Sequence, residues 1–298
     1  MSSPPKSSNT ADVIIIGGGL IGCTIALRLA QAGLSVCVLE RGEPGCEASS
    51  AAGGMLAPQG ETLEPGPLFE LCTASRDMYS AFVAEVSALS GIEVDYRRDG
   101  TLLVATSDHE QQELEAVHRA QTRMGLSIAR MTREAIHTRV PGLSTRIQYG
   151  LFVPGDHWLD NEKLCAAVAA ACRRVGVRML SRHSVTQLRA ENGRVADVEV
   201  VSESGARETL SAGHFVLTAG CWSAALVEPL GINLPMKPCR GQMMEFESPR
   251  GFPLTVRAGH HYLVPRPNGR VVVGTTSEYV GFDKAVTGEG IRSILAGA

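Results

Sequence analysis

The residues with the clearest chemical meaning are three glycines near the amino terminus. Gly17, Gly19 and Gly22 have the spacing Gly-x-Gly-x-x-Gly, between an apolar run at 12–16 and a helical pattern at 20–32. In a dinucleotide-binding turn the first glycine allows the tight bend, the second admits a pyrophosphate and the third lets the helix pack close to the strand. The helix N-terminus then faces the phosphates with free N–H groups and a partial positive charge. The pattern predicts a dinucleotide site.

An acidic residue follows at the distance that such a site needs. Glu40 ends the second apolar run, 40 − 22 = 18 residues after Gly22, close to the spacing of about 20 expected for a ribose-binding carboxylate. Its carboxylate would accept hydrogen bonds from ribose hydroxyls and would repel a 2′-phosphate, which disfavours NADP. The alternative is a glycine turn with an incidental surface glutamate.

The choice between FAD and NAD depends on the segment that comes next. Residues 45–58, GCEASSAAGGMLAP, offer many backbone N–H groups and little side-chain bulk. An NAD-binding fold usually proceeds directly into further strand–helix units, whereas this composition suits the close approach of an anionic or flat polar ligand. The alternative is a flexible surface loop, although its end, Gly54-Met55-Leu56-Ala57, is unusually apolar for one.

Composition argues against several other classes of function. The formal charge of -3, the pI near 6.3 and the lack of a Lys/Arg cluster disfavour nucleic-acid or anionic-membrane partners. The start, MSSPPKSSNT, has no apolar signal core, and no apolar run reaches about 18 residues, so we expect a cytoplasmic protein. The eight cysteines include no C-x-x-C pair. We therefore expect buried, reduced thiols and no metal site.

The order of the remaining patterns predicts a doubly wound domain interrupted by a β-rich one. Strands are expected at 12–16, 35–39, 94–106 (two strands), 177–180, 184–190, 195–201 and 214–218, and helices at 20–32, 69–90, 108–125, 132–140 and from 160 or 161 to 175. The turns Asn192-Gly193 and Ser204-Gly205 should join successive strands as hairpins. From Leu234 onward short apolar strands alternate with Pro and Gly turns.

Several blocks of the sequence resemble a known family. The runs VIIIGGGLIG and EASSAAGGMLAP look like the N-terminal signature of the D-amino-acid-oxidase-like FAD-dependent oxidoreductases. Further blocks are similar to the glycine oxidase branch that serves thiamine synthesis: LSGI at 89–92, WLDN at 158–161, LTAGCWS at 217–223, PCRGQ at 238–242, YLVPR at 262–266, VVGTT at 272–276 and GFD at 281–283. The resemblance covers about residues 11 to 295.

This resemblance implies a fold and a set of cofactor contacts. The fold is mixed α/β (α+β in part), with a Rossmann-like FAD-binding domain at 11–92 and 151–232, interrupted by a β-rich substrate domain at 93–150 and 233–298, after a disordered tail at 1–10. Flavin contacts are implied at Gly17, Gly19, Leu20, Ile21, Gly22, Glu40, Arg41, Ala48, Ser49, Gly53, Gly54, Met55, Val185, Ala219 and Gly220. At the last two, an ordinary strand end with a glycine is an equal alternative.

The resemblance also implies a reaction. FAD would oxidise glycine, or a small amine or D-amino acid such as sarcosine or D-alanine, with O₂, giving an imine or glyoxylate, ammonia and H₂O₂. The imine would feed thiazole synthesis. Tyr262 matches a tyrosine that bonds the substrate carboxylate, and His260 lies nearby; a core tyrosine and a solvated loop histidine are the alternatives. Since the chemistry belongs to the cofactor, no catalytic side chain is assigned.

Other classes of protein fit less well. An oxidase or dehydrogenase of another amine would share all these motifs, an NAD-dependent dehydrogenase would lack the segment 45–58, and a tRNA-modifying oxidase module would need a basic face.

The family also continues past Ala298 with an arginine that clamps the substrate carboxylate, and Arg240, Arg257 and Arg266 are only loose cations by comparison. We therefore expect a truncated chain that binds flavin and oxidises glycine poorly, and a homo-oligomer when the chain is complete.

Overall fold

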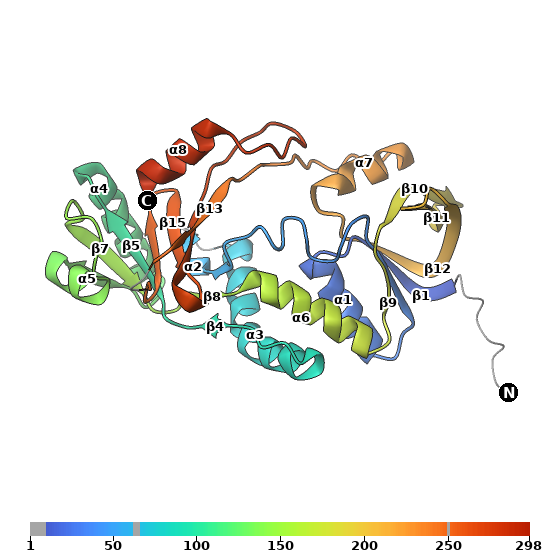
Figure 1. Ribbon diagram of the computed structural model, residues 1–298, viewed down its shortest axis with the longest axis horizontal. Helices are drawn as coiled ribbons and strands as arrows, with labels where there is room; N and C mark the ends of the chain where they lie inside the picture. The colour runs from blue at the N-terminus through green and yellow to red at the C-terminus, as the bar shows by residue number, and fades with distance from the viewer. Residues whose placement is uncertain (1–9, 62–65, 249–250) are drawn as a thin grey trace. The chain divides into compact units, whose positions relative to one another are not determined.

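The computed structural model describes residues 10–61, 66–248 and 251–298, which form two compact units (Figure 1). The first unit comprises the described residues up to Ala51 together with Ala84–Glu93 and Asn161–Pro238, and the second comprises Ala52–Val83, Val94–Asp160 and Cys239–Ala298. The long helix α3 (Pro67–Ser90) contributes residues to both. Among the described residues, no helix combines the length and the apolar character that crossing a membrane requires.

The first unit is built on a six-stranded sheet in the order β10-β11-β12-β1-β2-β9. Its parallel strands are β12 (Arg207–Leu217), β1 (Thr10–Ile16), β2 (Val36–Leu39) and β9 (Arg178–Leu180), and the antiparallel strands β10 (His183–Glu191) and β11 (Arg194–Ser202) extend one edge. Helix α1 (Leu20–Gln31) connects β1 to β2 and packs on α6 (Asn161–Arg174). This is the predicted β-α-β unit, in which the carboxyl ends of β1 and β2 lie at the same sheet edge.

Apolar residues explain why these elements form where they do. Val13–Ile16 and all of β2 are buried, as expected for parallel strands covered on both faces. The predicted hairpin turn joins β10 to β11, with Asn192 at φ 51° and Gly193 at φ 76°, the left-handed pair that a two-residue hairpin favours. After β12 come short helical segments: η1 (Gly220–Trp222), α7 (Ser223–Val227) and η2 (Glu228–Leu230).

The second unit contains two sheets. The larger has the order β13-β16-β15-β14-β5-β7-β6 and the smaller the order β3-β8-β4. The strands are β3 (Met55–Leu56), β4 (Tyr96–Arg97), β5 (Thr101–Ala105), β6 (Ala129–Thr132), β7 (Tyr149–Val153), β8 (His157–Leu159), β13 (Met243–Glu247), β14 (Thr255–Ala258), β15 (His261–Pro265) and β16 (Arg270–Gly274). Its remaining helical elements are α2 (Pro58–Glu61), α4 (Asp108–Arg123), α5 (Arg133–Arg139), η3 (Pro267–Gly269) and α8 (Gly288–Gly297).

The mixed α/β fold class is therefore confirmed, and three details differ from expectation. The segment 45–58, for which a flexible loop was the alternative, contains β3, because Met55 and Leu56 pair with β8, and α2 begins at its last residue. Thr10, placed in a disordered tail, begins β1, while the rest of that tail lies outside the described residues. Residues 52–83 and 151–160 belong to the second compact unit rather than the first. The division into an FAD-binding and a substrate domain stays a prediction.

Candidate flavin site

Backbone contacts require two of the three motif glycines. Gly17 has φ 106°, and a Cβ atom there would lie 2.5 Å from the carbonyl oxygen of Thr218. A Cβ on Gly22 would lie 2.1 Å from the carbonyl oxygen of Gly17 and 2.6 Å from Oγ1 of Thr218. That hydroxyl donates to the Gly17 carbonyl over 2.8 Å. The turn after β1, the start of α1 and the end of β12 are thus packed too closely for any side chain at these two positions.

Gly19 is different, since no protein atom requires it to be glycine. It is the N-cap of α1, with φ −68°, and a Cβ there would meet only Oγ of Ser49, at an ordinary 3.4 Å. The space in front of this helix N-terminus is therefore the space that a pyrophosphate would use. This observation fits an FAD diphosphate on the chain, in agreement with the sequence prediction.

Glu40 supports the glycine turn directly. Its side chain is only 8% exposed; Oε2 accepts from the backbone N–H of Gly18 over 2.8 Å and Oε1 from that of Gly42 over 2.7 Å. An ionised carboxylate offers about four lone-pair positions, so two remain for ribose hydroxyls. Glu40 thus has a structural task in addition to the predicted ribose contact, which the sequence spacing could not indicate.

A second loop is fixed against the start of α1. Oγ of Ser49 accepts from the backbone N–H of Leu20 over 3.0 Å, and the side-chain amide of Asn161 donates to the carbonyls of Ser49 and Ser50 over 2.9 and 2.7 Å. Asn161 is 4% exposed. In the sequence, Asn161 stands only at a predicted helix start and in the WLDN block, and neither feature indicates that it holds residues more than a hundred positions away in the chain.

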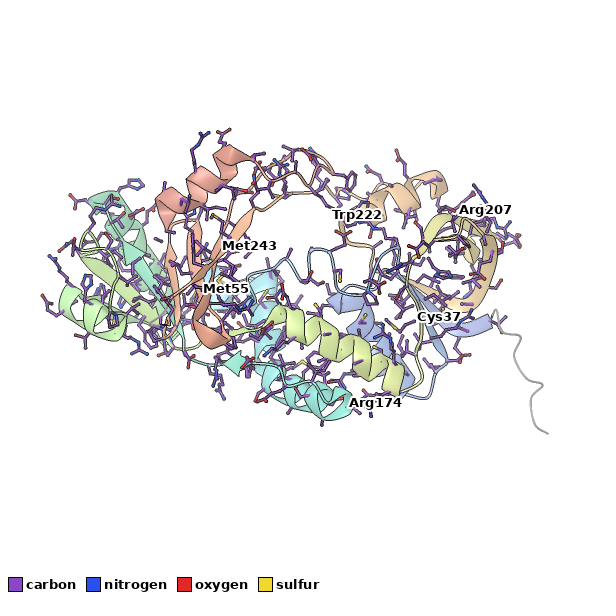
Figure 2. All side chains as sticks on the ribbon, viewed as in Figure 1. Cys37, Met55, Arg174, Arg207, Trp222 and Met243 are labelled. Atoms are coloured by element: carbon purple, nitrogen blue, oxygen red, sulfur yellow. The ribbon has the colours of Figure 1, made fainter. Side chains whose placement is uncertain are left out.

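The other predicted contacts in this unit lie around the same turn or on the sheet. Ile21 is 71% exposed at the start of α1, and Ala219 and Gly220 follow Thr218 beside Gly17. The Arg41 guanidinium lies 3.6 Å from the centre of the Trp222 ring and pairs with Glu47; Figure 2 labels Trp222. Ala48 is exposed beside Ser49, and Val185 lies on β10, the edge strand. Their contacts with flavin stay predictions.

The remaining predicted residues belong to the second unit and surround Tyr262. Gly53 lies against its ring, since a Cβ there would be 3.0 Å from Cε2. Gly54 has φ 73° and accepts the backbone N–H of Leu159 over 2.9 Å. Met55, opposite Trp158 in the β3–β8 ladder, packs with Met243, Trp158 and Tyr262 in one apolar cluster; Figure 2 labels both methionines. His260 is exposed in the turn between β14 and β15, the position of a solvated histidine.

The Tyr262 phenol is neutral and almost enclosed. It is 9% exposed, and its hydroxyl donates to the sulfur of Met243 over 3.6 Å. Burial raises the pKa of Tyr262, and a hydrogen bond with Thr275 acts in the opposite direction. A neutral phenol in this environment can donate a hydrogen bond to a carboxylate, which is stronger than one to a neutral acceptor.

The expectation that three arginines would be loose cations is wrong. Arg240 contacts Glu278 and Asp283. Arg257 donates to the Gly60 carbonyl over 2.7 Å, and the buried Arg266 donates to the Gly53 carbonyl over 3.1 Å. Sequence could not indicate these partners, because each lies at least 38 positions away from its arginine.

The cysteines only partly follow expectation. All eight are free thiols, but Cys46 and Cys239 are exposed whereas Cys23, Cys37, Cys165 and Cys172 are buried. Within the described part of the chain, no group of three or more His, Cys, Asp or Glu side chains is arranged to hold a metal ion.

Parallel strands with a glycine turn, a helix N-terminus and a carboxylate at the next strand end define a dinucleotide-binding fold. The chain belongs to the FAD dependent oxidoreductase family, whose model matches residues 12–298. FAD is the cofactor of this family, as the sequence predicted.

Individual relatives show the same relationship. The chain is 36% identical to the bifunctional protein ThiO/ThiG of Synechocystis, over 97% of this chain and 42% of that protein. It is 32% identical to a glycine oxidase of Bacillus licheniformis, over 89% of this chain and 69% of the relative. The crystal structure of glycine oxidase from Geobacillus kaustophilus superposes with a TM-score of 0.90 at 28% identity, covering 97% of this chain and 77% of that one. The chain thus spans about two fifths of the length of the bifunctional relative.

Proposed function

We propose that this protein is an FAD-dependent oxidase of glycine and other small amines. The observation that carries the proposal is similarity over nearly the whole chain to proteins named glycine oxidase, at 32% identity in one case and a TM-score of 0.90 in another. The glycine turn supports it independently, because Gly19 leaves space at the start of α1 that no protein atom fills.

The reaction removes two electrons and two protons from the substrate. Glycine, O₂ and water would give glyoxylate, ammonia and H₂O₂, through hydrolysis of the imine. The chemistry supplied by FAD, when bound, would be the acceptance of two electrons from the substrate and its reoxidation by O₂. The protein would contribute binding and orientation, which are worth several kcal/mol when reacting atoms are held in place.

Named residues would supply that orientation. Gly19 would admit the diphosphate, Glu40 would bind the ribose while bracing the turn, and Asn161 would keep the Ser49 loop fixed. The Tyr262 hydroxyl would donate to the carboxylate of the amino acid. The predicted contacts at Gly53, Gly54 and Met55 would line the same region as Tyr262, within the second unit.

A place in thiamine synthesis follows as a finer proposal. The bifunctional relatives carry the name ThiO/ThiG, and an imine or glyoxylate produced from glycine would feed thiazole formation. We further expect the protein to work in the cytoplasm as a homo-oligomer, without nucleic-acid or membrane partners.

The purified protein's spectrum and its peroxide release test the proposal. We expect a flavin absorption spectrum, release of all yellow colour on acid precipitation, and H₂O₂ formation with glycine. Sarcosine and D-alanine are the comparison substrates, and Gly19→Val, which fills the diphosphate space, is the control. Faster turnover of sarcosine would change the substrate assignment, whereas a colourless protein that neither binds added FAD nor forms peroxide would contradict the proposal.

A further inference from the structure

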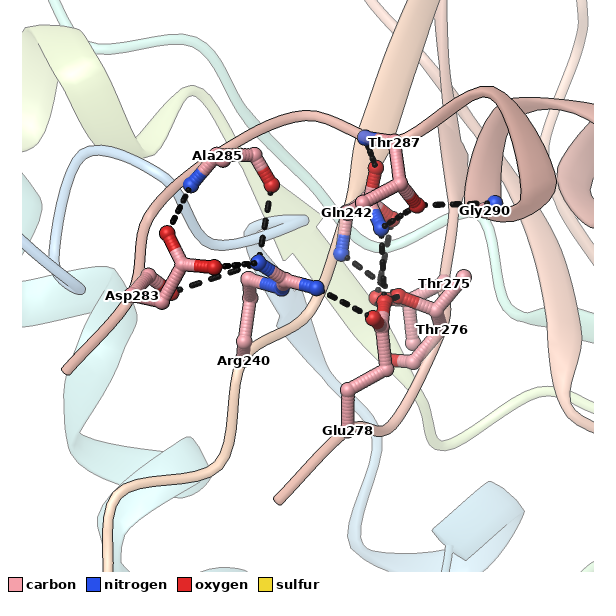
Figure 3. Close-up of polar contacts among 9 residues, drawn as sticks. All are labelled: Arg240, Gln242, Thr275, Thr276, Glu278, Asp283, Ala285, Thr287 and Gly290. Carbon is pink, nitrogen blue, oxygen red and sulfur yellow. Dashed lines mark hydrogen bonds and ion pairs between the residues drawn. The ribbon is translucent and has the colours of Figure 1, made fainter. Parts of the chain in front are cut away.

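A network of polar side chains joins two strand ends of the second unit to the segment that follows β16 (Figure 3). Arg240, whose side chain is 11% exposed, contacts Oε2 of Glu278 over 2.5 Å, Oδ2 of Asp283 over 3.2 Å and the Ala285 carbonyl over 2.9 Å. We call the set Arg240, Gln242, Thr276, Glu278 and Thr287 the strand-end network. Arg240 is the only cation in this set.

Glu278 connects the ion pair with Arg240 to Gln242 and Thr276. Its second oxygen, Oε1, accepts from Nε2 of Gln242 over 2.7 Å and from Oγ1 of Thr276 over 2.5 Å. Gln242 is 5% exposed and also bonds Thr287, the N-cap of α8, through both its amide oxygen and its amide nitrogen. The Glu278 carboxylate is therefore connected directly to Gln242, which precedes β13, and to Thr276, which follows β16. Through Gln242 it is also connected to the start of α8.

The strand end that the network holds lies against Tyr262. Gln242 directly precedes β13, and its carbonyl accepts from Oγ1 of Thr275 over 3.2 Å. In the sheet, Gly274 lies opposite both Met243 and Tyr262. A Cβ on Gly274 would be 2.5 Å from the Tyr262 hydroxyl, so the phenol lies directly over this strand end. Any shift of residues 274–276 would move the atoms against which that hydroxyl is placed.

Charge argues against Arg240 as the substrate's own carboxylate clamp. The Nη2 atom of Arg240 is bonded to Glu278 and Nη1 to Asp283 and the Ala285 carbonyl, whereas the buried Nε has no partner among the described residues. One cation beside two carboxylates leaves a net charge of 1 − 2 = −1 in this group. An amino-acid carboxylate would be repelled there, so Arg240 acts through Glu278 and not on the substrate.

We propose that Arg240 and Glu278 are positioning residues that hold the Tyr262 hydroxyl in place through Gln242, Thr276 and Thr275. This inference rests on the proposed function, in which Tyr262 binds the substrate carboxylate. The structural part of the proposal is that the Arg240–Glu278 ion pair fixes the position of the Tyr262 phenol. This part can be tested without measuring glycine oxidation.

Two variants isolate the ion pair. Glu278→Gln keeps Oε1 for Gln242 and Thr276 but places an amide against Arg240, so only the ion pair is lost; Arg240→Met removes the cation. Arg270→Met is the control, because Arg270 pairs with Glu245 between β16 and β13, the strands that Arg240 precedes and Glu278 follows, but both side chains of that pair are exposed. Thermal unfolding of each variant establishes that it is folded.

The first measurement uses fluorine NMR of protein labelled with 3-fluorotyrosine, with five tyrosine signals expected. The Tyr262 signal is the one that disappears in Tyr262→Phe. We expect it to shift or split in Glu278→Gln and Arg240→Met and to stay unchanged in Arg270→Met. An unchanged signal in both folded network variants would overturn the proposal.

The second measurement is a double-mutant cycle on KM for glycine with the FAD-loaded chain. We expect Arg240→Met to raise KM roughly 10-fold, the scale of one hydrogen bond to a charged group, and to have no further effect in a Tyr262→Phe background. Additive effects would overturn the proposal. Absence of glycine oxidation in the parent chain would instead contradict the proposed function, and the NMR result would still decide whether the ion pair positions Tyr262.

Discussion

The glycine turn and the Tyr262 region are fixed by opposite means. At the turn, Gly17 and Gly22 bring backbone segments so close that no side chain fits. Around Tyr262, the geometry depends on side-chain atoms, from the Met243 sulfur to the Glu278 carboxylate. We therefore expect added atoms at Gly17 or Gly22 to disturb the first region most, although Glu40 also braces it, and loss of single polar atoms to disturb the second, although Gly274 lies directly against the Tyr262 ring.

The largest expected effect comes from adding one methyl group at the turn. In Gly22→Ala the new Cβ would lie 2.1 Å from the Gly17 carbonyl oxygen, so α1 must move away from β1. Overpacking a well-packed site costs about 1–3 kcal/mol and occasionally more, and we expect a loss of about 3 kcal/mol. Chemical denaturation measures the free energy of unfolding.

Gly19→Ala is the matched control for that change. Its Cβ would meet only Ser49 Oγ at 3.4 Å, so we expect stability within about 0.5 kcal/mol of the parent but weaker FAD binding. If Gly19→Ala destabilised the apoprotein as much as Gly22→Ala, Gly19 would be a structural glycine and the diphosphate assignment would lose its support.

A smaller effect is expected on removing the Glu40 carboxylate. Glu40→Ala should weaken FAD binding by about 1.5–3 kcal/mol, the scale of hydrogen bonds to a charged group. It should also destabilise the apoprotein, because the N–H groups of Gly18 and Gly42 lose their acceptor. Titration with FAD, followed by flavin fluorescence, measures the first effect, and unchanged affinity would contradict the ribose assignment.

The contrast between local backbone geometry and contacts of distant side chains also explains which features the sequence alone could predict. Gly17, Gly19 and Gly22 are recognisable because their spacing reflects backbone geometry within six consecutive residues, and the Asn192-Gly193 turn is recognisable for the same reason. Gln242 and Glu278 are 36 positions apart and meet only in the folded sheet. No local pattern marks such a pair, so the sequence could not indicate that Arg240 and Gln242 share the Glu278 carboxylate.

A buried carboxyl group elsewhere in the second unit should make stability depend on pH. Asp156 is fully buried, and its oxygens accept from the backbone N–H groups of Gln59 and Gly60 over 3.3 and 3.1 Å. Burial raises the pKa of Asp156 to about 7, and those hydrogen bonds act in the opposite direction. It holds α2, the element that follows Met55 and Leu56.

The sign of the pH effect follows from the raised pKa. Between the unfolded value of 3.8 and the folded value of about 7, the folded state binds more protons, so the free energy of unfolding falls as pH rises and levels off above about 7. One proton corresponds to at most about 1.4 kcal/mol per pH unit. Asp156→Asn should remove this slope. Denaturation of both proteins at several pH values in this range is the measurement, and equal slopes would show that Asp156 is ionised in the folded protein throughout.

The smallest expected effect comes from the exposed ion pair Arg270–Glu245, which we compare with the pairs of the more enclosed Arg240. The Arg270 side chain is 39% exposed and contacts Glu245 over 3.1 Å, whereas the Arg240 side chain is 11% exposed and bonds two carboxylates. Exposed pairs contribute about 0.2–1 kcal/mol and are screened by salt. Arg270→Met should therefore lower the free energy of unfolding by less than about 1 kcal/mol, with the difference from the parent shrinking at high salt. Arg240→Met should cost more and keep part of its effect in salt, because Arg240 also bonds the Ala285 carbonyl and its partner Glu278 is hydrogen-bonded to Gln242 and Thr276. Equal, salt-sensitive losses in the two variants would mean that the strand-end network is an ordinary surface ion pair, and that Tyr262 is held by apolar packing alone.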